Sequence, residues 1–62
     1  MMVDTKKSYY WNVIDRHTHR ILGKQYASTR QEAIESWLGE NNQEVSPFNI
    51  SLLDADLVPG AI

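Results

Sequence analysis

Residues 28–39, STRQEAIESWLG, decide the fold because they combine the start, the buried face and the end of one amphipathic helix. Thr29 followed by Glu32 fits a capping box, and so does Ser28 followed by Gln31. At about 100° per residue, the apolar residues fall within about 140° of arc. They are Ala33, Ile34, Trp37 and Leu38. Gly39 stands where helices commonly end in a left-handed conformation, so the segment predicts a helix that ends there.

Two runs of aromatic and β-branched residues precede the helix and are typical of strands. Residues 8–15 read SYYWNVID and residues 20–27 read RILGKQYA. The short polar connection RHTH at residues 16–19 suits a β-hairpin. Gly23, inside the second run, indicates a β-bulge.

Side chains alternate between the two faces of a strand, so the first run divides into two sets. One set is Tyr9, Trp11 and Val13, and the other is Tyr10, Asn12 and Ile14. We expect the first set to face the core, because the second contains the amide of Asn12. Three large aromatic residues are expected in the core: Trp11, Trp37 and Phe48.

The chain after the helix predicts a loop and a third strand. Residues 40–47, ENNQEVSP, are polar, and a proline at position 47 disfavours helix at the residue before it. Residues 48–58, FNISLLDADLV, are expected to form the strand, with Phe48, Ile50 and Leu52 alternating with Asn49, Ser51 and Leu53. Pro59 and Gly60 end it.

These elements predict an α+β fold of β-β-α-β order, with one helix packed on one face of a three-stranded antiparallel sheet. The third strand crosses over to the free edge of the first, which gives the strand order 2-1-3. Residues 8–58 are expected to form a single domain between a flexible N-terminus, 1–7, and a short C-terminal tail, 59–62. The sheet face without a helix would expose part of a large apolar set: Tyr10, Ile14, Leu22 or Tyr26, and Leu53.

The composition weighs against catalysis and cofactor binding. The 62 residues include no cysteine, which excludes disulfides, thiolate zinc sites and cysteine nucleophiles. The sequence contains no GxSxG, P-loop, HExxH or GxGxxG motif. His17 and His19, with Asp15 nearby, supply fewer ligands than the four of a structural zinc site. We therefore expect exposed turn histidines, no metal, no cofactor and no enzyme; a weak metal site and a proton-transfer role are the alternatives.

No apolar run approaches the roughly 18 residues needed to span a bilayer. The N-terminus, MMVDTKK, lacks the apolar centre of a signal peptide. We expect a cytoplasmic protein without a membrane partner.

Charge is divided between the two halves of the chain. All six basic residues lie in residues 1–30, where the only acids are Asp4 and Asp15, so this half carries a charge of +4. Residues 31–62 contain the other six acids and no basic residue, so that half carries −6 and the whole chain −2. Such asymmetry indicates an electrostatic partner or a merely solvated surface. The acidic candidates for partner binding are Glu32, Glu35, Glu40 and Glu44. The candidates on the sheet and hairpin are Tyr10, Arg16, Arg20 and Lys24.

These features together favour a small non-enzymatic protein-binding module, an inhibitor or adaptor that occupies the surface of a partner protein with a basic surface. The predicted layout resembles that of several small phage-encoded anti-defence proteins, including some anti-CRISPR proteins. The resemblance implies an anti-defence role in a phage or another mobile element, and it concerns layout alone, so it assigns no residue role. The alternatives are a nucleic-acid-binding module that uses the basic hairpin, which the net charge of −2 disfavours, and a homodimer formed through the uncovered sheet faces.

Overall fold

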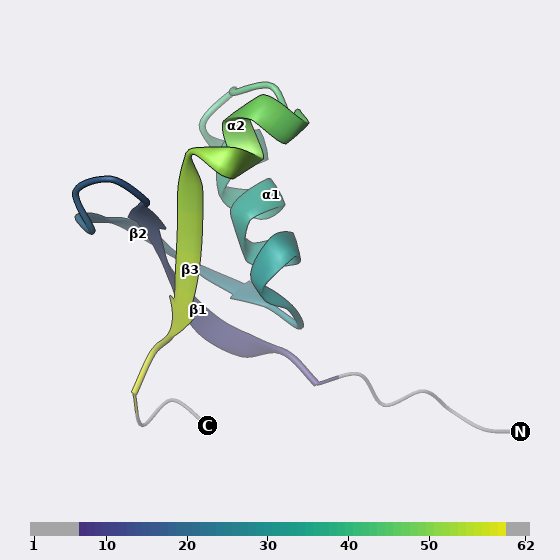
Figure 1. Ribbon diagram of the computed structural model, residues 1–62. Coiled ribbons are helices and arrows are strands. Elements are labelled where there is room, and N and C mark those ends of the chain that lie inside the picture. Colours follow the sequence, from purple (N-terminus) through teal and green to yellow (C-terminus); the bar gives the residue numbers. More distant parts are fainter. Residues whose placement is uncertain (1–6, 60–62) are drawn as a thin grey trace, which may run out of the picture.

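In the computed structural model, residues 7–59 are described, and they form three strands and two helices (Figure 1). The elements are β1 at Tyr9–Asp15, β2 at Ile21–Ala27, α1 at Arg30–Glu40, α2 at Pro47–Ser51 and β3 at Leu53–Leu57. The sheet has the order β2-β1-β3, and β1 pairs antiparallel with both neighbours. The predicted α+β fold and strand order are confirmed. The expected flexible N-terminus and C-terminal tail lie mostly outside the described residues.

Helix α1 begins with one half of the predicted capping box, because the Glu32 side chain bonds to Ser28 and not to the N–H of Thr29. The Thr29 hydroxyl oxygen accepts a hydrogen bond from the Glu32 backbone N–H at 3.2 Å. The Glu32 carboxylate turns back and accepts hydrogen bonds from both the backbone N–H and the hydroxyl of Ser28. Three donors at the helix start are thereby satisfied, and the Glu32 carboxylate lies at the positive end of the helix dipole.

Helix α1 ends one residue later than predicted. It continues through Gly39 to Glu40, and the left-handed residue is Asn42, with φ of 58°. The Gln43 N–H donates to the Leu38 carbonyl at 2.9 Å, and the Asn42 N–H donates to the Gly39 carbonyl at 3.2 Å. This pair of bonds is a Schellman motif, and it places the chain reversal at Asn42 because asparagine tolerates the left-handed region.

The predicted third strand is wrong in its first half, because residues 47–51 form helix α2. The Ser46 hydroxyl oxygen caps this helix by accepting from the Asn49 N–H at 3.2 Å, and Pro47 occupies the first turn. Proline is favoured at that position since its missing N–H has no helical partner to lose. Phe48, expected in the core, is 70% exposed as a result. The strand starts only at Leu53, which is buried on the helix-covered face instead of being exposed on the other.

The core lies between α1 and one face of the sheet, and α2 lies beside α1 near the start of β3 (Figure 1). Its buried residues are Val13, Ala27, Ala33, Ile34, Leu38, Leu53 and Ala55. Trp11, Trp37 and Ile50 are half-buried against this cluster. The predicted core face of β1 is therefore confirmed, although Ile14 on the opposite face is also buried.

Gly23 lets the Trp37 indole lie directly on β2. A Cβ atom at Gly23 would be 2.8 Å from the indole Nε1 and 3.0 Å from Cδ1, closer than van der Waals contact permits. The predicted bulge is found beside this glycine. Val13 pairs with Gly23 and Ile14 pairs with Ile21, which leaves Leu22 as the extra residue.

We predict that Gly23→Ala destabilises the protein by about 1–3 kcal/mol, the usual range for overpacking. The matched control is Gly39→Ala, because a Cβ at Gly39 meets nothing within 4 Å. In a helix this control should be neutral or stabilising by up to about 1 kcal/mol. The free energy of unfolding, from urea denaturation followed by circular dichroism, measures both changes.

The same substitution in a Trp37→Leu background should lose most of its penalty, because the atoms that the new methyl group meets belong to the indole. Equal free energies of unfolding for the wild type and Gly23→Ala, in both backgrounds, would contradict the close packing of Trp37 on Gly23.

Candidate functional site

The sheet face opposite α1 carries an exposed pair of tyrosines. Tyr10 on β1 and Tyr26 on β2 are directly paired across the strands. Their ring centroids are 4.8 Å apart and the ring planes are tilted by 51°. Tyr10 is 45% exposed and Tyr26 is 61% exposed, so the two rings form one aromatic surface that remains open to solvent.

Beyond the tyrosines, the uncovered face continues with a polar row and then an aliphatic one. Asn12 pairs with Lys24 on one side and with Asp56 on the other, and both charged residues are exposed. In the next row Ile14 pairs with Ile21, which is 60% exposed, on one side and with Asp54 on the other. This face is therefore mixed in chemistry, with aromatic and aliphatic ends separated by charges of both signs.

The turn between β1 and β2 presents Arg16 and Arg20 at the end of the sheet far from Tyr10. Its five residues, Arg16, His17, Thr18, His19 and Arg20, are all exposed. His19 adopts a left-handed conformation, with φ of 64°, and its N–H donates to the Asp15 carbonyl at 2.7 Å. The candidate set of the hairpin is thus split: Tyr10 and Lys24 share the uncovered face, whereas Arg16 and Arg20 lie in the turn.

The Asp15 carboxylate organises that turn. Its Oδ1 atom accepts hydrogen bonds from the backbone N–H groups of Thr18, at 3.0 Å, and His17, at 2.8 Å. These two N–H groups hold the pKa of Asp15 below its ordinary value of 3.8, because they stabilise the ionised form. This use of Asp15 is structural. Within residues 7–59 no group of three or more His, Asp or Glu side chains is placed to hold a metal ion.

The acidic candidates lie on the other side of the molecule. At about 100° per residue, Glu35, Glu32 and Glu40 cover about 140° of the outward half of α1. Each accepts a hydrogen bond within the chain: Glu32 from Ser28, Glu35 from Gln31 at 2.9 Å, and Glu40 from the buried Gln25 at 3.0 Å. Glu44 is exposed in the loop after α1. The sheet and helix separate these carboxylates from Tyr10, so the structure does not combine the two candidate sets into one surface.

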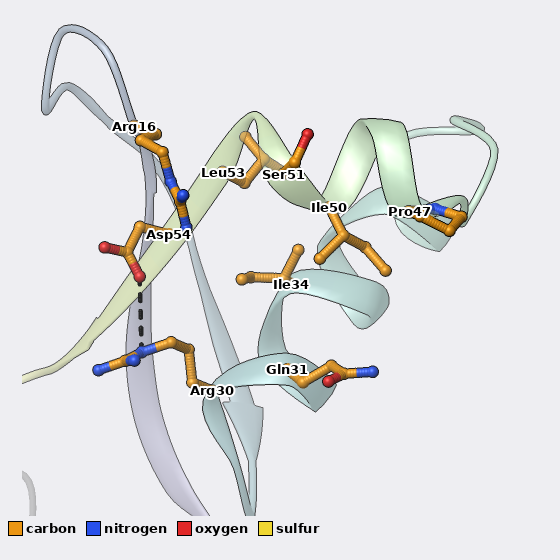
Figure 2. A pocket seen from close by; sticks show the side chains of 9 residues that line it. All are labelled: Arg16, Arg30, Gln31, Ile34, Pro47, Ile50, Ser51, Leu53 and Asp54. Carbon is orange, nitrogen blue, oxygen red and sulfur yellow. Dashed lines mark ion pairs between the residues drawn. The ribbon is translucent and has the colours of Figure 1, made fainter.

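A groove of about 590 Å3 lies between α1, α2 and the start of β3 (Figure 2). Aliphatic side chains of Ile34, Ile50 and Leu53 line it, together with the charged residues Arg16, Arg30 and Asp54. Arg30 lies inside the apolar arc of α1 in sequence, yet its guanidinium reaches β3. There its Nε donates to the Ala55 carbonyl at 3.1 Å and lies 3.5 Å from Asp54 Oδ1. The Asp54 carboxylate in turn accepts from the Ala55 N–H at 2.8 Å.

Sequence reasoning missed two features of these surfaces. From the sequence, Tyr26 was only one of two alternatives for the apolar set on the uncovered sheet face. The register of β1 and β2 is what places it opposite Tyr10. The Arg30–Asp54 pair joins residues 24 positions apart, and its one sequence signal is the basic side chain within the apolar arc of the helix.

Neither of the two helices described between residues 7 and 59 is long and apolar enough to cross a bilayer.

We predict that Asp15→Asn lowers stability at neutral pH and not in strong acid. Because the pKa of Asp15 is lowered by folding, the ionised carboxylate adds stability above its ordinary pKa of 3.8, and this contribution is lost as pH falls through the folded pKa. Urea denaturation of wild type and variant between pH 7 and pH 2 measures the difference, with Asp56→Asn as a control for the loss of one charge. A difference that is constant over the whole pH range would contradict this assignment.

Comparison with protein-family models, with curated proteins and with solved structures found no match for the chain. Its function is therefore inferred from the side chains themselves.

Proposed function

We propose that this protein is a non-enzymatic protein-binding module, an inhibitor or adaptor that occupies a partner protein's surface with the uncovered face of its sheet. The observation that carries the proposal is the exposed, mutually packed pair Tyr10 and Tyr26. Tyrosine supplies a large amphipathic contact area at a low cost in side-chain entropy, and it is enriched among the residues that dominate binding energy.

The surroundings of the pair support this use. The two rings lie on adjacent strands whose backbone is fixed by the β1–β2 ladder, so the aromatic surface is already formed before binding. Lys24 and Asp56 flank it with charges that can be solvated or paired at the edge of an interface. Among inhibitor roles we favour the anti-defence role of a phage or other mobile element, which the resemblance in layout implies and which would place the protein in the cytoplasm.

The acidic side chains of α1 and its following loop serve a separate purpose in this proposal. Because Glu32, Glu35 and Glu40 lie on the side away from the tyrosines, one flat interface cannot bury both sets. We assign docking to the sheet face and long-range attraction of a partner with a basic surface to the carboxylates, Glu44 included. Such charges mainly raise the association rate, and salt weakens their effect.

Nucleic-acid binding is the second candidate, and the β1–β2 turn is the observation that favours it. Arg16 and Arg20 are exposed there on a turn held by the Asp15 carboxylate. The tyrosine surface lies at the opposite end of the strands, so base stacking on Tyr10 and phosphate contacts from the turn would have to engage distant parts of one strand. The net charge of −2 also opposes phosphate binding.

We predict that the double variant Tyr10→Thr/Tyr26→Thr loses the partner. Threonine keeps the β propensity of both positions while removing the aromatic contact. The matched control is Phe48→Ser, which removes an aromatic side chain that is 70% exposed on α2, away from the sheet face. Proteins that the wild type retains from a lysate are purified, and their affinities for the wild type, the control and the double variant are measured by surface plasmon resonance. Removing a single tyrosine that dominates binding weakens an interface by about 2 kcal/mol, or about 30-fold, so the double variant should lose at least this much affinity.

Circular dichroism of each variant controls for the fold. An affinity that the tyrosine substitutions leave unchanged would contradict the proposal. Retained material that is sensitive to nuclease and is lost in Arg16→Ser/Arg20→Ser would favour the nucleic-acid-binding candidate instead. Dimers of the wild type that dissociate in the tyrosine variant, seen by sedimentation velocity, would identify a second copy as the occupant of the face.

A further inference from the structure

The two edges of the sheet differ in whether their backbone groups are already bonded. At the β3 edge, the C=O of Ala55 accepts from Arg30 Nε at 3.1 Å and its N–H donates to Asp54 Oδ1 at 2.8 Å. These bonds block the middle of that edge, a common protection against unwanted strand pairing. Strand β2 forms the other edge, on the far side of β1 (Figure 1). Of the two, β2 is therefore the edge at which another strand can be added.

The backbone of β2 alternates between groups that face β1 and groups that face the open edge. The Asp15 N–H donates to the Arg20 C=O at 2.9 Å, so the odd-numbered residues of β1 direct their N–H and C=O groups toward β2. Their partners include Gln25, which lies opposite residue 11. Lys24 and Tyr26 flank Gln25 and therefore point their own N–H and C=O groups away from β1. Within residues 7–59 no hydrogen bond reaches these outward groups.

The side chains along this edge are exposed, and a basic one lies at its centre. Tyr26 is 61% exposed, Leu22 is 37% exposed, and the exposed Lys24 lies between them. Lys24 forms no ion pair with any residue from 7 to 59, so its ammonium group can meet an acid on an added strand. Opposite charges that face each other across two strands stabilise the pairing, whereas like charges destabilise it. The edge thus favours a strand with an acid opposite Lys24.

Lys24 also opposes pairing of β2 with a second copy of itself. An antiparallel pair that used the whole strand, Ile21–Ala27, would place the two Lys24 side chains opposite each other, because Lys24 is the middle residue. Every other register shortens the ladder. A strand from a different protein meets neither obstacle, so the charge of this edge favours a partner protein over a second copy.

We propose that the partner protein supplies an extended segment that pairs antiparallel with the β2 edge, with an aspartate or glutamate opposite Lys24 and an apolar side chain beside Tyr26. The inference rests on the proposed protein-binding function and names the element that the partner contributes. In such strand addition, main-chain hydrogen bonds give affinity and alternate side chains give specificity. The acid and the apolar residue stand two positions apart, since alternate residues of a strand share a face. The added strand extends the uncovered face beyond Tyr26, so strand and tyrosine surface form one interface.

The probe is the blocked heptapeptide acetyl-Thr-Ile-Thr-Glu-Thr-Ile-Thr-amide, titrated into isotope-labelled protein and followed by the NMR signals of the backbone amides. We expect the amide protons of Lys24 and Tyr26 to shift downfield as they gain hydrogen bonds. When the peptide occupies about nine tenths of the protein, hydrogen exchange of these two amides should slow about tenfold, because exchange then proceeds from the unbound tenth.

Methylation of peptide nitrogens tests the backbone pairing. A methyl group on the glutamate nitrogen removes a donor that faces β2, so this peptide should bind at least about tenfold more weakly. The matched control carries the methyl group on the nitrogen of the threonine after the glutamate, whose N–H faces away from β2. Its affinity should stay within about twofold of that of the unmodified peptide.

Charge reversal tests the side-chain pairing. The peptide with lysine in place of glutamate should bind about fivefold more weakly, because it places like charges opposite each other. Lys24→Glu should reverse this preference. Arg16→Glu makes the same charge change in the exposed turn, away from the centre of the edge, and should keep the preference for the glutamate peptide.

Four results would overturn the proposal. They are unmoved Lys24 and Tyr26 signals at every peptide concentration, equal affinities of the two methylated peptides, and an unchanged preference for the glutamate peptide in Lys24→Glu. The fourth is protection of the Lys24 and Tyr26 amides that grows with protein concentration in the absence of peptide, which would assign the edge to a second copy. The tyrosine face is tested separately with a whole partner protein, so each of these results leaves that proposal in place.

Discussion

The close approach of α1 to the sheet is the interaction on which the rest of this structure depends. Gly23 lies directly beneath the Trp37 indole, and three alanines, Ala27, Ala33 and Ala55, are buried at the contact between helix and strands. Small side chains at these positions let one short helix exclude water from three strands at once. A domain of this size buries only about 60% of its unfolded surface, so it has little reserve if that contact is loosened.

Covering one face with a single helix has a direct consequence for function. Side chains of β1 alternate, so fixing Val13 in the core also fixes Tyr10 on the opposite face, and pairing brings Tyr26 beside it. The same packing leaves β3 as an edge strand, and the guanidinium of Arg30 and the carboxylate of Asp54 engage the outward C=O and N–H of Ala55. The tyrosine surface is thus the part of the sheet that α1 does not cover.

Much of the fold could be predicted from the sequence because its signals are local. The capping box at Thr29, the apolar stripe of α1 and the two aromatic runs identify the helix and the hairpin, and crossover rules then give the strand order. Helix α2 was missed because Ser46 and Pro47 indicate a helix start as well as a strand break, and the spacing of Phe48, Ile50 and Leu52 imitates a strand. The binding surfaces were only partly predictable, since the Tyr10–Tyr26 pair needs the strand register and the Arg30–Asp54 pair needs the tertiary fold.

Helix α1 covers one face of the sheet and leaves the tyrosine face open in the free protein. Relaxation of side-chain protons by a neutral, soluble gadolinium chelate tests this claim directly, because the effect depends on how closely the chelate can approach each proton. We expect strong relaxation of the Tyr10 and Tyr26 ring protons and weak relaxation of the Val13 methyl groups. Tyrosine rings as well protected as Val13 in the free protein would contradict it.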